Sequence, residues 1–281
     1  MTTQPPFRVR YWGVRGSIPA PGPETIRYGG NTTSLEVQCG DRTYAIDGGT
    51  GVRLLGNDLI RRMPVDVTFL MTHLHWDHVQ GFPFFTPFLL PGNRFTIYSG
   101  HHNGGNILDV LKQLMAQPAF PISMDAFRSE VNFRFLTAGD VLDFGDLQVK
   151  TTLLEHPGGV VGYRFEFGGR SFVHASDWEH PVDGSFDQAF LDFIRDADVL
   201  SVDATYTDDE YNGRSGPVRK GWGHATHEAA LAHAEAANVK KTILSHHEQS
   251  RPDDELDALA TKLFEGRDAC FAVEGMVIDL L

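Results

Sequence analysis

Four side chains of types that bind metal ions lie within residues 73–78, in the segment HLHWDH. The segment directly follows residues 65–71 (VDVTFLM), a mostly apolar run that is typical of a buried strand. Side chains two residues apart in an extended segment share one face, so His73 and His75 can bind one cation together. A turn into a helix would then place Asp77 and His78 at a neighbouring position. Neutral imidazoles and a carboxylate suit zinc, and also iron or manganese.

Three later residues offer further ligands, and each lies at the carboxyl end of a predicted strand, where α/β sheets open their binding crevice. They are His156 after residues 147–154, Asp177 after residues 171–175 and His246 after residues 242–244. One predicted ligand set is His73, His75 and His156. The other is Asp77, His78 and His246, with Asp177 bridging the two ions. Two cations about 3.5–4 Å apart can share and acidify one water and stabilise developing oxygen charge. We therefore expect two divalent transition-metal ions, with zinc preferred and manganese or iron possible.

Other histidines and loop residues have a structural explanation that is as good as a functional one. A histidine at a strand end is usually a satisfied surface or core residue, and the same alternative applies to each ligand taken singly. We expect His174 and His233 to be structural, and we assign no role to His101, His102 and His180. Arg15, Ser17 and Asn31 lie in Gly-rich loops, where they serve either substrate contact or loop architecture.

The composition excludes several classes of protein. Among 281 residues, 24 Lys and Arg against 37 Asp and Glu give a formal net charge of −13. Broad binding to nucleic acids or anionic membranes needs a positive field, which this balance does not supply. No run approaches the roughly 20 apolar residues of a membrane helix, and residues 1–13 lack the regions of a secretory signal. Cys39 and Cys270 form no CxxC pair, so we expect a cytoplasmic protein without disulfides or a zinc finger.

Strand and helix patterns alternate along the chain and predict a mixed α/β sandwich in one domain, residues 1–281. Residues 118–134 mix Pro, Phe and polar residues without a clean period, and we assign them no element. The predicted strands are residues 7–12, 34–37, 42–46, 65–71, 94–98, 147–154, 160–167, 171–175, 199–202, 242–244 and 269–273. The predicted helices are residues 52–62, 107–115, 187–195, 227–238 and 254–264.

The HLHWDH segment and its three downstream ligands resemble the pattern of the metallo-β-lactamase superfamily of dinuclear metallohydrolases. The resemblance covers nearly the whole chain, from WGVRGS (12–17) to LSHH (244–247), with the ligands in the same order. It implies a four-layer αβ/βα sandwich of two mixed sheets flanked by helices. It favours His246 over the adjacent His247 as the ligand, because the matching position directly follows the apolar strand. Asp47 and Asp203 match acids that hydrogen-bond to ligand histidines, although a turn or cap explains them equally well.

A second motif, His224-Ala225-Thr226, opens a predicted helix near the C-terminus. It resembles the His-x-Thr motif of the branch that contains ribonuclease Z and cyclic-phosphodiester hydrolases. In that branch the histidine donates a proton to the departing alkoxide, and the resemblance implies this role for His224. A positioned acid accelerates hydrolysis of such diesters about 10²–10⁴-fold. The alternative is an N-terminal helix residue in a Gly-rich loop, KGWGHATHE. Asp77, besides binding metal, would orient or deprotonate the attacking water.

These features favour a metal-dependent phosphodiesterase that acts on a small cyclic phosphodiester, such as a cyclic nucleotide or a ribosyl cyclic phosphate. The runner-up is tRNA 3′ processing of the ribonuclease Z type, which uses a long basic arm. The only candidate for such an arm is the short segment GRSGPVRKGWG (213–223). A lactamase or thioesterase, and a nonhydrolytic binding protein that keeps the fold, are further alternatives. Nucleic acid is otherwise not an expected partner, and a homodimer is suggested by analogy alone.

Overall fold

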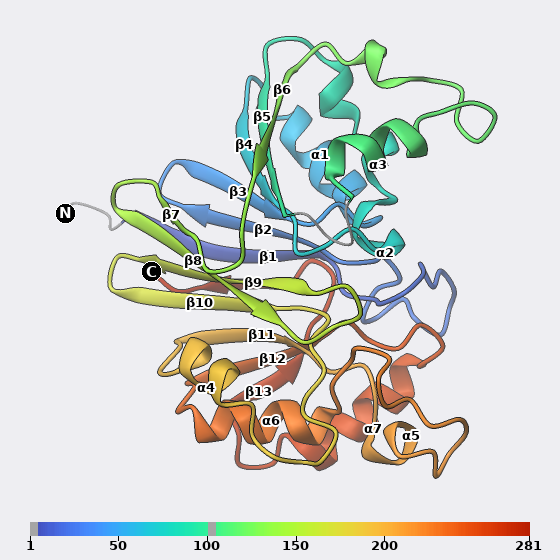
Figure 1. The fold of residues 1–281 in the computed structure, drawn as a ribbon, viewed down its shortest axis with the longest axis vertical. Helices are drawn as coiled ribbons and strands as arrows, with labels where there is room; N and C mark the ends of the chain where they lie inside the picture. Colours follow the sequence, from blue (N-terminus) through green and yellow to red (C-terminus); the bar gives the residue numbers. More distant parts are fainter. Residues whose placement is uncertain (1–4, 101–104) are drawn as a thin grey trace.

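The computed structural model describes residues 5–100 and 105–281, so His101 and His102 lie outside the described part of the chain. Its strands form two seven-stranded sheets that face each other across a shared core (Figure 1). Apolar residues alternate with polar ones where a strand has one buried face. In β1, Phe7, Val9 and Tyr11 are fully buried, whereas Arg8 between them is exposed. The alternation turns one face of each sheet toward the other.

The first sheet has the strand order β14-β1-β2-β3-β4-β5-β6. β14, β1, β2 and β3 pair antiparallel, and β3 to β6 pair parallel, so the sheet is mixed. Its strands are β1 (Phe7–Gly13), β2 (Ser34–Cys39), β3 (Arg42–Ile46), β4 (Asp66–Leu70), β5 (Arg94–Ser99), β6 (Glu130–Phe135) and β14 (Val277–Asp279).

The second sheet repeats this plan with the order β13-β12-β11-β10-β9-β8-β7. β7 to β10 pair antiparallel, and β10 to β13 pair parallel. Its strands are β7 (Val141–Asp143), β8 (Leu147–Leu154), β9 (Val160–Phe167), β10 (Arg170–Ala175), β11 (Val199–Asp203), β12 (Lys241–Ser245) and β13 (Ala269–Phe271).

Helices cover the outer face of each sheet and complete four layers. α1 and α3 lie on the first sheet, and α4, α6 and α7 lie on the second (Figure 1). α1 buries Val52, Leu55 and Leu59, the spacing of a single helix face, against Phe69 of β4. The helices are α1 (Val52–Ile60), α2 (Trp76–Val79), α3 (Ile107–Leu114), α4 (Gln188–Ile194), α5 (Asp208–Tyr211), α6 (His227–Ala236), α7 (Asp253–Leu263) and the 3₁₀ turns η1 (Phe82–Phe84), η2 (Thr86–Leu89) and η3 (Met124–Ala126).

The architecture confirms the predicted α/β fold of two mixed sheets flanked by helices. Residues 118–134, which received no element, contain η3 and most of β6, an edge strand of the first sheet. None of the residues of β6 is fully buried, so its sequence shows no clean alternation. The three-residue strands β7 and β14 also went unpredicted, since so short a run carries little pattern.

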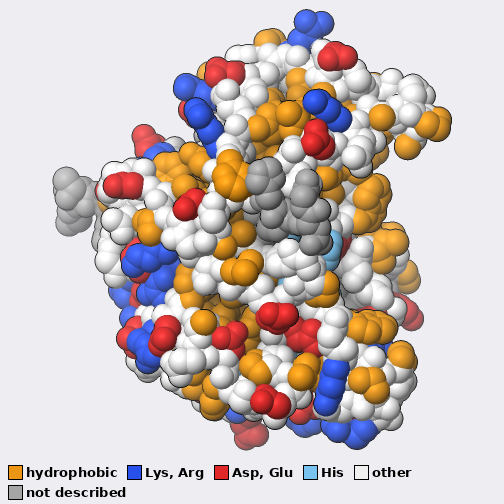
Figure 2. Space-filling model, in the orientation of Figure 1, with side chains coloured by type: hydrophobic (Ala, Val, Ile, Leu, Met, Phe, Trp, Pro, Cys, Tyr) orange, Lys and Arg blue, Asp and Glu red, His pale blue; other side chains and the backbone are white. Residues whose placement is uncertain are grey.

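Two surface properties complete the description. None of the helices in the described part of the chain combines the length and the apolar character needed to cross a bilayer. Figure 2 shows histidine atoms reaching the surface near the boundary between the upper and lower halves of the molecule.

Candidate metal centre and acid–base pair

The candidate site lies where strands from both sheets end. β4 of the first sheet precedes the HLHWDH segment, and β8, β10, β11 and β12 of the second sheet precede the other candidate residues. Parallel strands that share an edge bring their carboxyl ends together, which is where α/β proteins bind ligands. The structure therefore gathers residues that are up to 173 positions apart, from His73 to His246, into two groups that share Asp177 and a third group, Asp203, His224 and His246, that shares His246 with the second.

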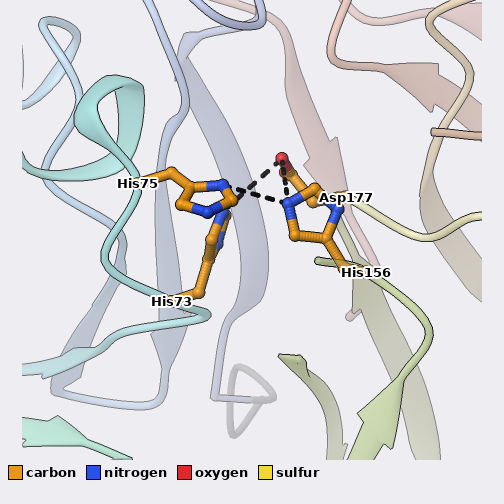
Figure 3. Close-up of side chains that lie close together, drawn as sticks. All are labelled: His73, His75, His156 and Asp177. Atoms are coloured by element: carbon orange, nitrogen blue, oxygen red, sulfur yellow. Dashed lines mark hydrogen bonds and ion pairs between the residues drawn. The ribbon is translucent and has the colours of Figure 1, made fainter. Parts of the chain in front are cut away.

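The first group consists of His73, His75, His156 and Asp177, whose ligand atoms all lie within 4.8 Å of one another. Figure 3 shows the three imidazoles and the carboxylate turned toward one another. Nε2 of His156 lies 3.0 Å from Nδ1 of His75, and Nε2 of His73 lies 3.7 Å from Oδ2 of Asp177. His75 is exposed and the other three are buried, so the group is open to solvent on the His75 side. A cavity of about 260 Å³ adjoins His73 and His75 on that side.

The second group consists of Asp77, His78, Asp177 and His246, all of them buried. Nε2 of His246 lies 3.1 Å from Oδ2 of Asp77, and Nε2 of His78 lies 3.1 Å from Oδ1 of Asp177. α2 begins immediately after His75, and this turn into a helix brings Asp77 and His78 to the second group. The backbone N–H of Ser17 donates a hydrogen bond of 2.7 Å to Oδ2 of Asp77 and orients its carboxylate.

Asp177 belongs to both groups. It lies two residues beyond the end of β10 and has a φ of +56°, a left-handed conformation that Asp tolerates better than most residues. Its Oδ2 lies 3.7 Å from Nε2 of His73 and 3.4 Å from Nε2 of His246. One carboxylate is therefore shared between the two sets of imidazoles, and its role as a bridging ligand stays a prediction.

Two buried nitrogen atoms fit a metal ligand set better than a self-contained cluster. Nε2 of His73 is buried and forms no hydrogen bond with a described residue. Nε2 of His78 is also buried, and its 3.1 Å contact with Oδ1 of Asp177 is an ion-pair contact that lacks the geometry of a hydrogen bond. A buried polar atom without a partner costs about 1–3 kcal/mol, a cost that bonding to a cation removes. Imidazole nitrogen with carboxylate oxygen is a donor set suited to zinc, manganese or iron. The residues present therefore fit a pair of divalent cations.

The other ring nitrogen of His78 is fixed by a carboxylate. Nδ1 of His78 lies 2.8 Å from Oδ2 of Asp47, which directly follows β3. The hydroxyl of Thr72 donates to the same oxygen at 2.7 Å, and the backbone N–H of Thr72 donates to Oδ1. A hydrogen bond on one ring nitrogen sets the tautomer and leaves the other nitrogen free for a metal. Asp47 thus holds Nε2 of His78 toward the cluster.

The structure separates the neighbours His246 and His247. His246, with a φ of +61°, turns its ring into the second group. His247 points away, and its Nε2 donates to the backbone carbonyl of Ala272 at 2.8 Å. His246 is further held by Thr205, whose hydroxyl lies 3.1 Å from its Nδ1.

The electrostatics of the two groups differ: burial opposes protonation of the histidines in the first group and lowers their pKa values, whereas carboxylates raise the pKa values of the histidines in the second group. Burial lowers the pKa of His73 well below its ordinary value. Burial also opposes protonation of His78, but Asp177, Asp77 and Asp47 outweigh it and raise the pKa of His78 well above its ordinary value. For His246, burial is again outweighed by Asp177 and other carboxylates, which raise its pKa to about 9. The same carboxylates would attract a divalent cation.

His224 lies beside the metal cluster and is paired with an acid. Its Nδ1 lies 2.9 Å from Oδ2 of Asp203, the last residue of β11. Its ring stacks on that of His246 with centroids 4.8 Å apart, and it is 9% exposed. The backbone N–H of Ala225 donates to the other oxygen of Asp203 and fixes that carboxylate. The bond to Asp203 leaves Nε2 of His224 for proton transfer, the arrangement of a general acid or base.

Residues expected to be structural lie outside the two groups. Nδ1 of His174 lies 3.2 Å from the Ser201 hydroxyl, and Nε2 of His233 accepts from the backbone N–H of Asp187. Arg15 is fully buried and donates to the backbone carbonyls of Gly29, Glu248 and Arg251. Arg15 is therefore part of the loop architecture. Ser17, for which substrate contact and loop architecture were both left open, contacts Asp77 through its backbone N–H. Thr205 contacts His246, and no local sequence signal marked that contact.

Gly223 offers a test of how closely the loop before His224 approaches the cluster. Its φ is +89°, and a Cβ there would lie 2.2 Å from Nδ1 of His156. Gly223→Ala is therefore expected to displace His156 and to weaken zinc binding, in addition to a strain of about 1–2 kcal/mol from the left-handed backbone. Gly92→Ala is the matched control, because its φ is +90° but a Cβ meets no atom within 4 Å. Thermal unfolding and zinc titration of both variants check this prediction. A Gly223→Ala protein with the zinc affinity of the control variant would contradict it.

The chain is similar to several known proteins. A curated ribonuclease Z from Bradyrhizobium sp. (strain ORS 278) is 24% identical over 314 residues, covering 92% of this chain and 95% of the relative. A crystal structure of a diphosphatase from the PhnP family covers 98% of both chains with a TM-score of 0.71 and 18% identity. Human tRNase Z, short form, covers 96% of this chain and 98% of its own, with a TM-score of 0.65 and 18% identity.

The superfamily expected from the HLHWDH segment is confirmed by the family model. That model, described as the beta-lactamase superfamily domain, matches residues 42–247. The match extends from β3 to His247 and so includes every candidate metal ligand and His224. On this evidence the chain belongs to the beta-lactamase superfamily.

Proposed function

We propose that the protein is a metal-dependent phosphodiesterase that holds two divalent cations, with zinc preferred. The observation that carries the proposal is Asp177, whose carboxylate is shared by the two imidazole groups beside His224. When bound, a pair of cations neutralises charge on a phosphoryl group and acidifies a water. The candidate ligands are His73, His75, His156, Asp77, His78, Asp177 and His246.

The chain supplies a proton donor beside these ligands. A departing alkoxide is a poor leaving group, so a diester with an alkyl leaving group needs protonation at the leaving oxygen. His224 is placed for that step because Asp203 holds its Nδ1 and leaves Nε2 available. Asp77, held by the backbone N–H of Ser17, is placed to orient the attacking water as well as to bind metal. The His224–Asp203 pair favours a phosphodiesterase over a lactamase or thioesterase.

The preferred substrate is a small cyclic phosphodiester, such as a cyclic nucleotide or ribosyl cyclic phosphate. The net charge of −13 lacks the attraction that long RNA needs, and Figure 2 shows acidic and basic side chains intermixed on the face it displays. tRNA 3′ processing is the second candidate, supported by the ribonuclease Z relative that matches 92% of the chain. A cytoplasmic location, a single domain and a homodimer stay predictions.

A panel of substrates tests this function on zinc-reconstituted protein. We expect two metal ions per chain, hydrolysis of bis-p-nitrophenyl phosphate and of a cyclic nucleotide or ribosyl cyclic phosphate, and loss of both activities on chelation. Nitrocefin and an acyl-glutathione serve as controls and should not be turned over. Turnover of nitrocefin or an acyl-glutathione without diester hydrolysis would contradict the proposal. Precise cleavage of pre-tRNA at higher kcat/KM than the cyclic diesters would replace the preferred substrate by the second candidate.

A further inference from the structure

A buried carboxylate lies just outside the metal cluster. Glu179 follows Asp177 by two residues in the loop after β10, and it is 5% exposed. Its Oε1 accepts hydrogen bonds of 2.6 Å from the Tyr211 hydroxyl and from the backbone N–H of Gly221. Its Oε2 accepts one of 2.7 Å from the backbone N–H of Gly223. All three donors are uncharged, and a buried carboxylate is costly unless such bonds are complete.

The loop that Glu179 holds leads to two side chains of the candidate site. The carbonyl of Gly223 accepts a hydrogen bond of 2.8 Å from Nδ1 of His156. That bond directs Nε2 of His156 toward His75 and Asp177. The next residue in the chain is His224, whose ring contacts that of His156 with centroids 5.4 Å apart. Moving residues 221–223 therefore moves both the imidazole of His156 and that of His224.

We propose that Glu179 is a positioning residue that fixes, through residues 221–223, both His156 as a metal ligand and His224 as the proton donor. Glu179 lies in the same loop as Asp177. Its hydrogen bonds therefore connect the loop of Asp177 to the loop that precedes His224. The inference rests on the proposed function for His224. The part of the inference that concerns His156 rests only on the hydrogen bond from its Nδ1 to the carbonyl of Gly223.

The alternative is that Glu179 only stabilises the fold. The two ideas differ in what they predict for leaving groups. A loss of folded protein lowers turnover of every substrate in the same ratio. A displaced His224 lowers turnover of a diester with an alkoxide leaving group far more than that of bis-p-nitrophenyl phosphate, because p-nitrophenolate needs little protonation. The ratio of the two kcat values is independent of the folded fraction.

The test is Glu179→Gln, which keeps the size of the side chain but turns an NH₂ group toward one of the three donors. We expect a zinc affinity about tenfold lower by titration with zinc chloride, the scale typical of residues that orient metal ligands. We also expect the ratio of kcat for the best cyclic diester to kcat for bis-p-nitrophenyl phosphate to fall about tenfold. In the His224→Ala background, Glu179→Gln should not lower this ratio further, because its effect runs through His224.

Glu166→Gln is the matched control, since Glu166 of β9 also accepts from a nearby group, Arg164, and is not part of the site. It should leave both readouts at the wild-type value. If Glu179→Gln fails to fold, Glu179→Asp replaces it, because shortening the side chain withdraws the acceptors without removing the charge. The proposal is overturned if zinc affinity and the kcat ratio are unchanged, or if only one of them changes. If the wild-type protein hydrolyses no diester, the proposed function fails, and the zinc titration alone decides whether Glu179 positions His156.

Discussion

Asp177→Asn is expected to reduce the bound metal from two ions per chain toward one and to lower kcat by about 10²–10³-fold, the scale seen when one preorganised group that stabilises the transition state is removed. The substitution keeps the shape of the side chain and removes its charge. Asp177 is buried beside Nε2 of His73, His78 and His246, so an amide there places an NH₂ group against ligand nitrogens. Metal analysis and steady-state kinetics on bis-p-nitrophenyl phosphate measure the two effects.

The control for Asp177→Asn is Asp198→Asn. Asp198 is a partly buried carboxylate that binds Arg170 and Lys240 outside the site. It should keep two metal ions and wild-type kcat, even if its melting temperature falls. An Asp177→Asn protein with two tightly bound ions and normal turnover would remove Asp177 from the ligand set.

His224→Ala is expected to lower kcat about 10²–10⁴-fold on diesters with an alkoxide leaving group, the range of general acid catalysis. The loss should be much smaller on bis-p-nitrophenyl phosphate, because p-nitrophenolate leaves without a proton. Asp203→Asn should show the same leaving-group pattern in weaker form, since Asp203 fixes the tautomer of His224 through a 2.9 Å contact. Kinetics on both classes of diester measure the pattern.

His233→Ala is the matched control, another buried histidine, whose Nδ1 donates to the backbone carbonyl of Ala229. It should leave the ratio of the two kcat values unchanged. Equal losses on both classes of diester in His224→Ala would exclude His224 as the acid. The metal content of His224→Ala should stay at two ions per chain, because neither of the two groups that share Asp177 includes His224; its own group is formed with Asp203 and His246.

The sequence predicted much of the candidate site because its residues follow strands that are easily recognised. Residues 65–71 and 171–175 have the apolar character of buried strands, so the positions of His73 and Asp177 at strand ends follow directly. Asp47 and Asp203 were also visible as strand-end acids. The structure shows that each carboxylate contacts a histidine of the site, His78 and His224 respectively.

The features that the sequence did not predict depend on contacts between loops that are far apart in the chain. Glu179 meets Gly223 across 44 positions, and nothing in either local sequence marks the pair. The orientation of His246 depends on a φ of +61°, which strand alternation does not predict, since alternation applies only to extended residues. β6 was not predicted because neither face of this edge strand is fully buried, so its apolar and polar residues do not alternate.

The origin of the candidate ligands has a mechanical consequence for the whole sandwich. His73, His75, Asp77 and His78 follow a strand of one sheet, whereas His156, Asp177 and His246 follow strands of the other. A cation held by both sets would link the two sheets at one end of their interface, where they otherwise meet through apolar packing and hydrogen bonds such as that from the Tyr163 hydroxyl to the backbone carbonyl of Met71. Separating the two sheets would then require release of the metal. The stability of the contact between the sheets and the binding of metal are therefore thermodynamically linked.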